Sequence, residues 1–179
     1  AFNLRRDQAY IGIMVDDLIT KGCLEPYRMF TSRAEYRLML RIDNADLRLT
    51  PVARDAGLIS DQDWARFSAR RDRYTKNVAH LREVKVRVAS GDRVPASQAL
   101  KQPEVRLSAL VATGEVSVEL TPHCGHIDAI SAETTVKFEG YLLRQEQSVE
   151  RANRQEQRRI PNEFSYAGIP GLSREMVQR

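Results

Sequence analysis

The feature that most constrains the fold is a mostly apolar stripe that runs from Trp64 to Leu81. Its members follow alternating steps of three and four residues, and they are Trp64, Phe67, Arg71, Tyr74, Val78 and Leu81. This is the spacing of a helix that packs against another helix. Ser60, with Asp63 three residues later, predicts where that helix begins. We interpret the stripe as core packing rather than as a cofactor site.

A second long helix is predicted to begin near Glu133 or Thr134 and to end at Ile160-Pro161. One of its faces carries Phe138, Tyr141, Leu142, Gln145, Val149 and Ala152. We expect it to be the antiparallel mate of the first long helix. Shorter helices are predicted over 5–21, stopped by Gly22, over 52–56 after Thr50-Pro51, over 97–100 and over 106–111. Strand signals are slight, so the sequence predicts a mainly α fold, a helical domain with an antiparallel long-helix pair, short helices and loops.

Composition limits the class of protein. With 179 residues and 42% hydrophobic residues, the chain can build one large or two small domains. It contains no apolar run of the roughly 18 to 20 residues that span a bilayer, and its first 20 residues do not have the layout of a signal peptide. We therefore expect a soluble, cytoplasmic protein. Because the sequence starts without methionine and stops inside a helix expected from Ser173, we also expect a piece of a longer protein.

A block of arginines with no lysine lies between Glu25 and Thr50, interspersed with aromatic residues. Its members are Arg28, Arg33, Arg37, Arg41 and Arg48. The guanidinium group is a planar, permanently charged fork that binds phosphate in two-pronged fashion and stacks on flat rings. The block therefore predicts an anionic partner, most naturally one that carries phosphate.

Two local structures fit this block. Ser32 and Glu35 have the spacing of a capping box, which predicts a helix on which Arg33, Arg37 and Arg41 fall at i, i+4 and i+8. Alternation of apolar and arginine positions between 36 and 42 instead favours a strand. Either geometry places the three arginines on one side. The polar run 43–46 then predicts a turn that ends the element.

A competing interpretation is that these arginines pair with nearby carboxylates in an ion network, namely Glu25, Glu35, Asp43 and Asp46. A weaker basic signal lies on the second long helix, where Lys137 and Arg144 flank aromatic residues. They are either phosphate contacts or solubilising charges.

Motifs for self-contained chemistry are missing from the sequence. None of the nine glycines lies two residues from another, so no GxGxxG dinucleotide motif can be drawn. His123-Cys124-Gly125-His126 crowds three ligand types into four residues, a spacing that does not favour a metal site. Cys23 and Cys124 have no CxxC partner. We predict no catalytic residue, no metal and no autonomous active site in this chain.

Several motifs resemble the GidA/MnmG family of tRNA uridine 5-carboxymethylaminomethyl modification enzymes. The resemblance rests first on 9–22, 25–41 and 43–50, and then, in the same order, on Lys137 to Tyr141, Arg144-Gln145, Ile160-Pro161, Phe164 to Tyr166 and Gly171 to Ser173. It spans nearly the whole chain and is weakest over 86–135.

The resemblance implies an FAD-dependent enzyme whose Rossmann-type N-terminal domain precedes a mostly helical C-terminal domain. It implies that NADH, a methylene-folate donor and GTP on the partner GTPase MnmE take part in modifying the wobble uridine of tRNA, and that the full-length enzyme is a homodimer. The flavin fingerprint and the reactive cysteines of the family are absent here. We therefore expect a C-terminal portion, inactive alone, in which 1–50 adjoins the FAD domain and 51–179 is the helical domain.

Two functions remain open on this basis. In the first, the chain contributes tRNA and MnmE contacts, and the tRNA-binding residues are Arg28, Arg33, Arg37, Arg41, Arg48, Lys137 and Arg144. In the second, the chain is purely a protein-interaction or dimerisation module with no direct tRNA contact, and its arginine block is buried against the flavin domain.

Overall fold

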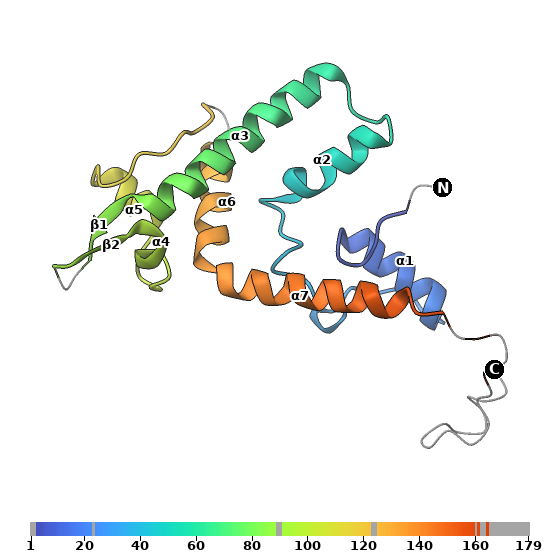
Figure 1. Cartoon of the computed structure of the whole chain (residues 1–179). Coiled ribbons are helices and arrows are strands. Elements are labelled where there is room, and N and C mark those ends of the chain that lie inside the picture. The colour runs from blue at the N-terminus through green and yellow to red at the C-terminus, as the bar shows by residue number, and fades with distance from the viewer. Residues whose placement is uncertain are drawn as a thin grey trace. The chain divides into compact units, whose positions relative to one another are not determined.

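The computed structural model describes residues 3–22, 24–88, 91–122, 125–159, 161 and 164. They form two compact units, Ala1–Glu146 and Gln147–Arg179. The predicted mainly α class is confirmed, because helices supply most of the described secondary structure (Figure 1). None of the described helices is long and apolar enough to cross a membrane.

The longest helix, α3 (Asp61–Glu83), starts where the sequence predicts. The Ser60 hydroxyl accepts a hydrogen bond from the Asp63 amide at 3.2 Å, and Asp61 and Asp63 place negative charge in the first turn. Both features stabilise a helix start, since the amide is satisfied and the helix dipole is complemented. Most of the predicted stripe lies inward, and Phe67, Val78 and Leu81 are buried. Arg71 is exposed, so the prediction of core packing is wrong at that position.

The main hydrophobic core collects side chains from α3 and from the elements that follow it. These elements are β1 (Lys85–Arg87), β2 (Arg93–Pro95), α4 (Ala96–Ala99), α5 (Leu107–Ala112) and α6 (Gly125–Lys137). Leu81, Leu100 and Leu107 are fully buried in this core. Burying each such side chain contributes about 1.5–3 kcal/mol relative to leaving it in water.

The helix that pairs with α3 is α6, and the pairing is not the predicted one. The expected second helix is broken at Phe138 into α6 and α7 (Glu139–Glu156). Arg70 bonds to Ser131, Tyr74 to Thr135 and Arg82 to Glu139, so later residues of α3 meet later residues of the partner. The two helices therefore run in the same sense, and the prediction of an antiparallel pair was wrong.

A small antiparallel hairpin follows α3 and was missed by the sequence analysis. Val86 pairs with Val94, and Arg87 pairs with Arg93. Gly91 has φ of 90°, a conformation that glycine adopts without strain. Strands of three residues are too short for periodicity to reveal, although the alternation of valines at 84, 86 and 88 was a signal.

The helix α1 (Tyr10–Lys21) carries a second, smaller core. Gly22 (φ 67°) ends the helix as predicted, but α1 begins later than the predicted start. Ile13 of α1 packs with Ala34 and Leu40. At Gly12 the backbone of residues 4 and 5 comes so close that a Cβ would lie 2.3 Å from the Arg5 carbonyl oxygen. Only glycine permits this contact.

The arginine block forms neither the predicted helix nor the alternative strand. A single 3₁₀ turn (Thr31–Arg33) is followed by turns as far as Met39. Ser32 does not cap a helix there, because Glu35 binds Arg6 instead of returning to the cap amide. The predicted turn at 43–46 is confirmed only at residues 43 and 44, because α2 (Ala45–Asp55) starts inside it and contains Pro51.

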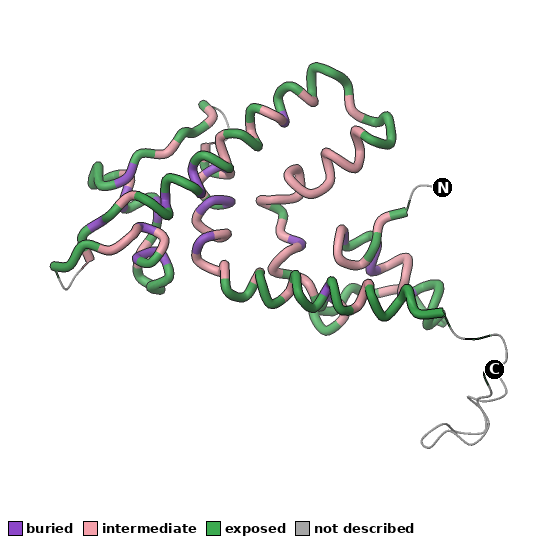
Figure 2. Tube along the Cα trace, viewed as in Figure 1, coloured by how far each residue is buried: buried purple, intermediate pink, exposed green. Residues whose placement is uncertain are grey.

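Helix α7 continues from the first unit into the second. It is mostly exposed, and Val149 is its buried residue (Figure 2). Several predictions fall on residues outside the described ranges, among them Cys23, His123, Cys124, the loop after Pro161 and the helix expected at Ser173.

Candidate functional site

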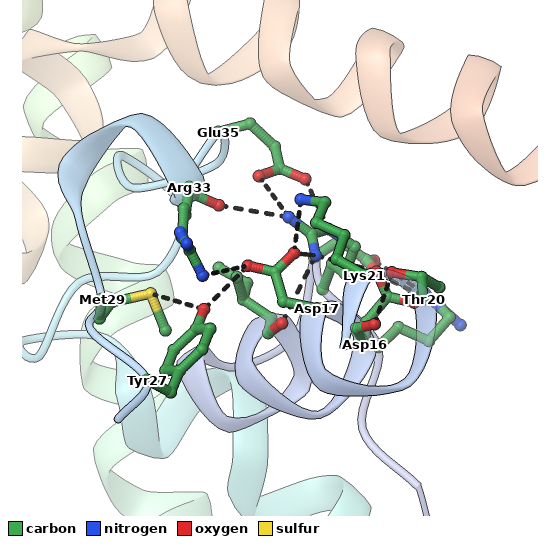
Figure 3. Close-up of polar contacts among 12 residues, drawn as sticks. Asp16, Asp17, Thr20, Lys21, Tyr27, Met29, Arg33 and Glu35 are labelled. Atoms are coloured by element: carbon green, nitrogen blue, oxygen red, sulfur yellow. Dashed lines mark hydrogen bonds and ion pairs between the residues drawn. The ribbon is translucent and has the colours of Figure 1, made fainter. Parts of the chain in front are cut away.

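Asp17 of α1 is the centre of a polar network that holds the arginine-rich segment 25–41 in place (Figure 3). The side chain of Asp17 is 1% exposed. Its carboxylate accepts hydrogen bonds from Lys21 Nζ at 2.8 Å, from Arg6 Nη1 at 2.9 Å and from the Tyr27 hydroxyl at 2.9 Å. Arg33 Nη1 lies 3.6 Å from the same group. One buried acid is therefore surrounded by three cations and a phenol.

Arg6 ties this network to the turn that follows the 3₁₀ helix. Its guanidinium donates in two-pronged fashion to Glu35, with Nε–Oε1 at 2.8 Å and Nη2–Oε2 at 3.0 Å. Nη2 also donates to the Arg33 carbonyl at 3.2 Å. Charge-assisted forks of this kind fix both distance and orientation. The position of Arg33 thus depends on residues about thirty positions earlier in the chain.

The ionisation of the network follows from these contacts. The hydrogen bond from Lys21, with those from Arg6 and Tyr27, outweighs burial and holds the pKa of Asp17 well below its ordinary value. The hydrogen bond to Glu35 raises the pKa of Arg6. Burial works to raise the pKa of Glu35, but the Arg6 fork and a backbone hydrogen bond lower it overall.

These shifts predict a loss of stability in acid. Because the pKa of Asp17 is lower in the folded than in the unfolded chain, its contribution is complete above the unfolded value of about 3.9 and declines as the pH falls further. Urea unfolding between pH 7 and pH 3 should show a steeper loss below pH 4 for the parent than for Asp17→Asn, with a difference that approaches about 1.4 kcal/mol per pH unit at the acid end. Equal slopes would contradict this assignment.

A basic pocket lies beside the network. Its cavity of about 170 Å³ is lined in part by Lys21, Arg28 and Arg33, together with the rings of Tyr27 and Phe30. The Arg33 guanidinium carbon lies 4.9 Å from the Tyr27 ring centre and 5.8 Å from that of Phe30. Positive charge next to aromatic faces is suited to an anionic ligand that also carries flat rings.

Arg28, Arg33 and Arg37 form the outward part of the segment. Arg28 and Arg37 are exposed, and neither pairs with a carboxylate among the described residues. The side chain of Arg33 is 36% exposed, beside Asp17. Two of these three arginines therefore keep their full binding capacity for a partner.

Arg41 and Arg48 are used inside the protein. The side chain of Arg41 is 13% exposed, pairs with Asp43 at 3.0 Å and donates to the Leu38 carbonyl at 2.6 Å. Arg48 donates to Asn44, to the Arg41 carbonyl and to the Gln8 carbonyl, and burial followed by the nearby Arg41 lowers its pKa. The predicted single row at i, i+4 and i+8 does not exist, because the helix it required is absent.

Lys137 and Arg144 have different roles. Lys137 Nζ donates to three backbone carbonyls between Gln102 and Val105, at 3.3–3.5 Å. Arg144 is exposed and stacks over Tyr141 at 5.9 Å. Its neighbour Gln145 donates to the Glu35 carbonyl at 3.3 Å, which brings the start of α7 to the arginine-rich segment.

The sequence analysis missed Arg6, Asp17, Lys21 and Tyr27, the residues that position the segment. A signal existed, since Asp17 follows Ile13 by four residues and so falls on the buried face of α1. A carboxylate on a buried face needs cationic partners. The partners themselves could not be identified without the fold.

A flavin or dinucleotide does not fit the described residues. Such sites are built on parallel βαβ units with glycine-rich turns, whereas the strands described here form one antiparallel hairpin. Within the described ranges, no three His, Cys, Asp or Glu side chains gather closely enough to hold a metal ion.

Comparisons with known proteins agree on one family. A family model described as the tRNA modifying enzyme MnmG/GidA C-terminal helical domain matches residues 61–146. The tRNA uridine 5-carboxymethylaminomethyl modification enzyme MnmG of Syntrophotalea carbinolica is 40% identical over 98% of this chain. The chain spans 30% of that relative's length.

Solved structures give the same result. The Aquifex aeolicus GidA structure in the form II crystal is similar with a TM-score of 0.78 and 33% identity, over 99% of this chain and 29% of that one. The form I crystal gives a TM-score of 0.74 at 33% identity, over 99% of this chain and 28% of that one.

Proposed function

Because the chain belongs to the MnmG/GidA family of tRNA-modifying enzymes, we propose that it forms the C-terminal helical portion of such an enzyme and contributes contacts to tRNA. In this proposal residues 1–50 adjoin the flavin domain and 51–179 act as the helical domain. FAD and NADH are assigned to the part of the full-length enzyme that this chain does not span, and we derive no step through them.

One observation carries the tRNA proposal. Arg28 and Arg37 are exposed and unpaired among the described residues, while Arg33 stands between two aromatic rings in the same segment. Of the carboxylates nearby, Asp17 and Glu35 are occupied by Arg6 and Lys21, while Glu25 lines the same pocket as Arg28 and Arg33. The segment therefore presents net positive charge on a fixed scaffold, as phosphate-backbone binding requires.

The proposed tRNA contacts involve fewer residues than the seven that the sequence predicts. We propose Arg28, Arg33, Arg37 and Arg144 as the tRNA contacts, because their side chains are exposed or partly exposed. Arg41, Arg48 and Lys137 have internal roles, and we expect their replacement to affect folding more than tRNA affinity.

The test is binding of unfractionated tRNA to the 179-residue chain across a salt series. The double variant Arg28→Gln/Arg37→Gln should bind roughly tenfold more weakly at about 0.1 M salt. The slope of log affinity against log salt should fall by about two, one for each lost phosphate contact.

The matched control is Arg66→Gln/Arg154→Gln, which removes the same charge from exposed positions on α3 and α7. We expect it to bind nearly as tightly as the parent. If both double variants lost tRNA affinity equally, net charge alone would explain the effect. If neither lost affinity, the proposed contact would be refuted.

A second candidate function is a protein-interaction module without tRNA contact. It is favoured by the apolar surface of α1, where Ile11 and Ile19 are 56% and 77% exposed. Its partners would be the flavin domain, the GTPase MnmE or a second subunit. Recovery of the chain with MnmE after ribonuclease treatment, without measurable tRNA affinity, would favour this candidate.

A further inference from the structure

The hairpin of β1 and β2 carries three cations on one face, far in sequence from the arginine-rich segment. Arg87 and Arg93 stand directly opposite each other, and Lys85 precedes Arg87 by two residues on the same side. Val86, on the other side, is 1% exposed in the main core. The valines thus fix the hairpin, and the cations face outward. We call Lys85, Arg87 and Arg93 the hairpin cation face.

No carboxylate neutralises this face within the described residues. None of the three side chains forms an ion pair there, although exposed lysines and arginines elsewhere do. The nearest acid in the same cavity is Glu115, whose carboxylate accepts the Arg87 backbone amide at 2.9 Å. Its charge is thus directed at the backbone, and the face keeps an excess of positive charge.

An added anion would make this arrangement more favourable, because Glu115 is the one acid among the residues that line the cavity. Like charges directly opposite in an antiparallel pair repel each other and destabilise the hairpin. The three cations and Glu115 line an open cavity of about 400 Å³ with Gly114. An anion placed in this cavity would relieve the repulsion and contact two arginine forks at once.

We propose that the hairpin cation face binds the phosphate backbone of RNA as a second contact, separate from the segment 25–41. Lys85 and Arg87 stand about 6.6 Å apart along the strand, so neighbouring cations can contact neighbouring phosphates. Arginine forks match phosphate and carboxylate oxygens alike, so their geometry does not by itself select RNA over an acidic peptide. The choice of RNA rests on the proposed function, whereas the preference for an anion rests on the hairpin alone.

The first test compares tRNA binding by three forms of the 179-residue chain in a salt series. The triple variant Lys85→Gln/Arg87→Gln/Arg93→Gln should lower affinity at least tenfold and reduce the salt slope by two to three. Glu115→Gln, which removes the one acid of the cavity, should raise affinity about twofold. A melting temperature no lower than that of the parent confirms that each variant keeps the fold, and the triple variant should melt slightly higher because the repulsion is removed.

The outcomes separate this proposal from the preceding one. Loss of binding in Arg28→Gln/Arg37→Gln, with none in the hairpin triple variant, overturns the hairpin contact and keeps the arginine-rich segment. The reverse result supports the hairpin and refutes the segment. If polyglutamate displaces tRNA from the hairpin as well as tRNA itself does, an acidic polypeptide is the partner and the RNA assignment is wrong.

A second readout needs no variant. Bound tRNA should slow acetylation of Lys85 several-fold, measured by mass spectrometry, and leave Lys76 unchanged. Lys76 is a suitable control, because its side chain is 67% exposed on α3 and pairs with Glu119. Equal protection of both lysines, or of neither, would overturn the hairpin contact.

Discussion

Replacing Asp128 with alanine is expected to lower the free energy of unfolding by about 3–5 kcal/mol, the cost of leaving buried charges without their partner. Asp128 lies in the first turn of α6 and is 1% exposed. Its Oδ2 accepts the Thr121 amide at 2.8 Å and the Thr121 hydroxyl at 2.7 Å. Its Oδ1 lies 2.9 Å from Arg70 Nη1. The alanine variant removes all of these contacts together.

The loss extends to the packing of α3 on α6. Arg70 is 11% exposed and Arg73 is 24% exposed, so neither guanidinium can turn freely to water. Arg70 also donates to Ser131, whose hydroxyl donates to the Asp43 carbonyl. Without Asp128, Arg73 has no carboxylate partner among the described residues, and Arg70 keeps only the partly exposed Asp46 at 3.4 Å. We therefore expect the helical domain to unfold at lower urea concentration.

The measurement is urea unfolding followed by the fluorescence of Trp64, the single tryptophan, which lies in α3. The control is Glu119→Ala. It removes an acid whose side chain is 56% exposed and lies 3.7 Å from Lys76, a surface pair worth less than about 1 kcal/mol. If both variants shifted the midpoint equally, Asp128 would have no special role in the core.

Replacing Asp17 with alanine is the second large effect, again about 3–5 kcal/mol, because Arg6, Lys21 and Arg33 would lose the acid that separates them. The variant should also bind tRNA more weakly, although its net charge is more positive. The reason is positional, since Tyr27 and Arg33 are held by Asp17 and by Arg6. Hydrogen exchange of the α1 amides and tRNA affinity would measure the two effects.

Asp16→Ala is the matched control for this prediction. It changes the net charge by the same amount, but the Asp16 side chain is 45% exposed and contacts Arg6 alone among the described cations. We expect it to keep its tRNA affinity or to gain slightly. A gain of affinity in both variants would mean that total charge, rather than the arrangement of the segment, governs binding.

Local signals predicted local structure well in this chain. Ser60 predicted the start of α3 because its hydroxyl and the Asp63 amide that donates to it lie three residues apart. Gly22 gave the end of α1 because its positive φ depends on its own missing side chain. The Ser32–Glu35 pattern failed because Glu35 has a stronger partner 29 residues away. A capping box competes with tertiary contacts for the same side chain. The sequence spacing reveals the capping box but not the tertiary contact.

The sequence predicted that arginines form the candidate site, but not which of them are available to a partner. All five arginines of the block look alike in the sequence, yet Arg48 is occupied by the Gln8 carbonyl and Arg41 by Asp43. Arg28 and Arg37 remain exposed. Which arginine is available depends on contacts with residues before the block, and no periodicity within the block encodes them.

The close packing at Gly12 limits how far the chain can be truncated from its N-terminus. The backbone of residues 4 and 5 touches Gly12 directly and carries Arg6 to its partners. A shortened version that started at Tyr10 would keep α1 whole and retain the entire block. It would nonetheless lack Arg6, which donates to Asp17 and Glu35. Poor RNA retention by such a version would therefore report the loss of the contacts that position the segment, not a wrong choice of arginines.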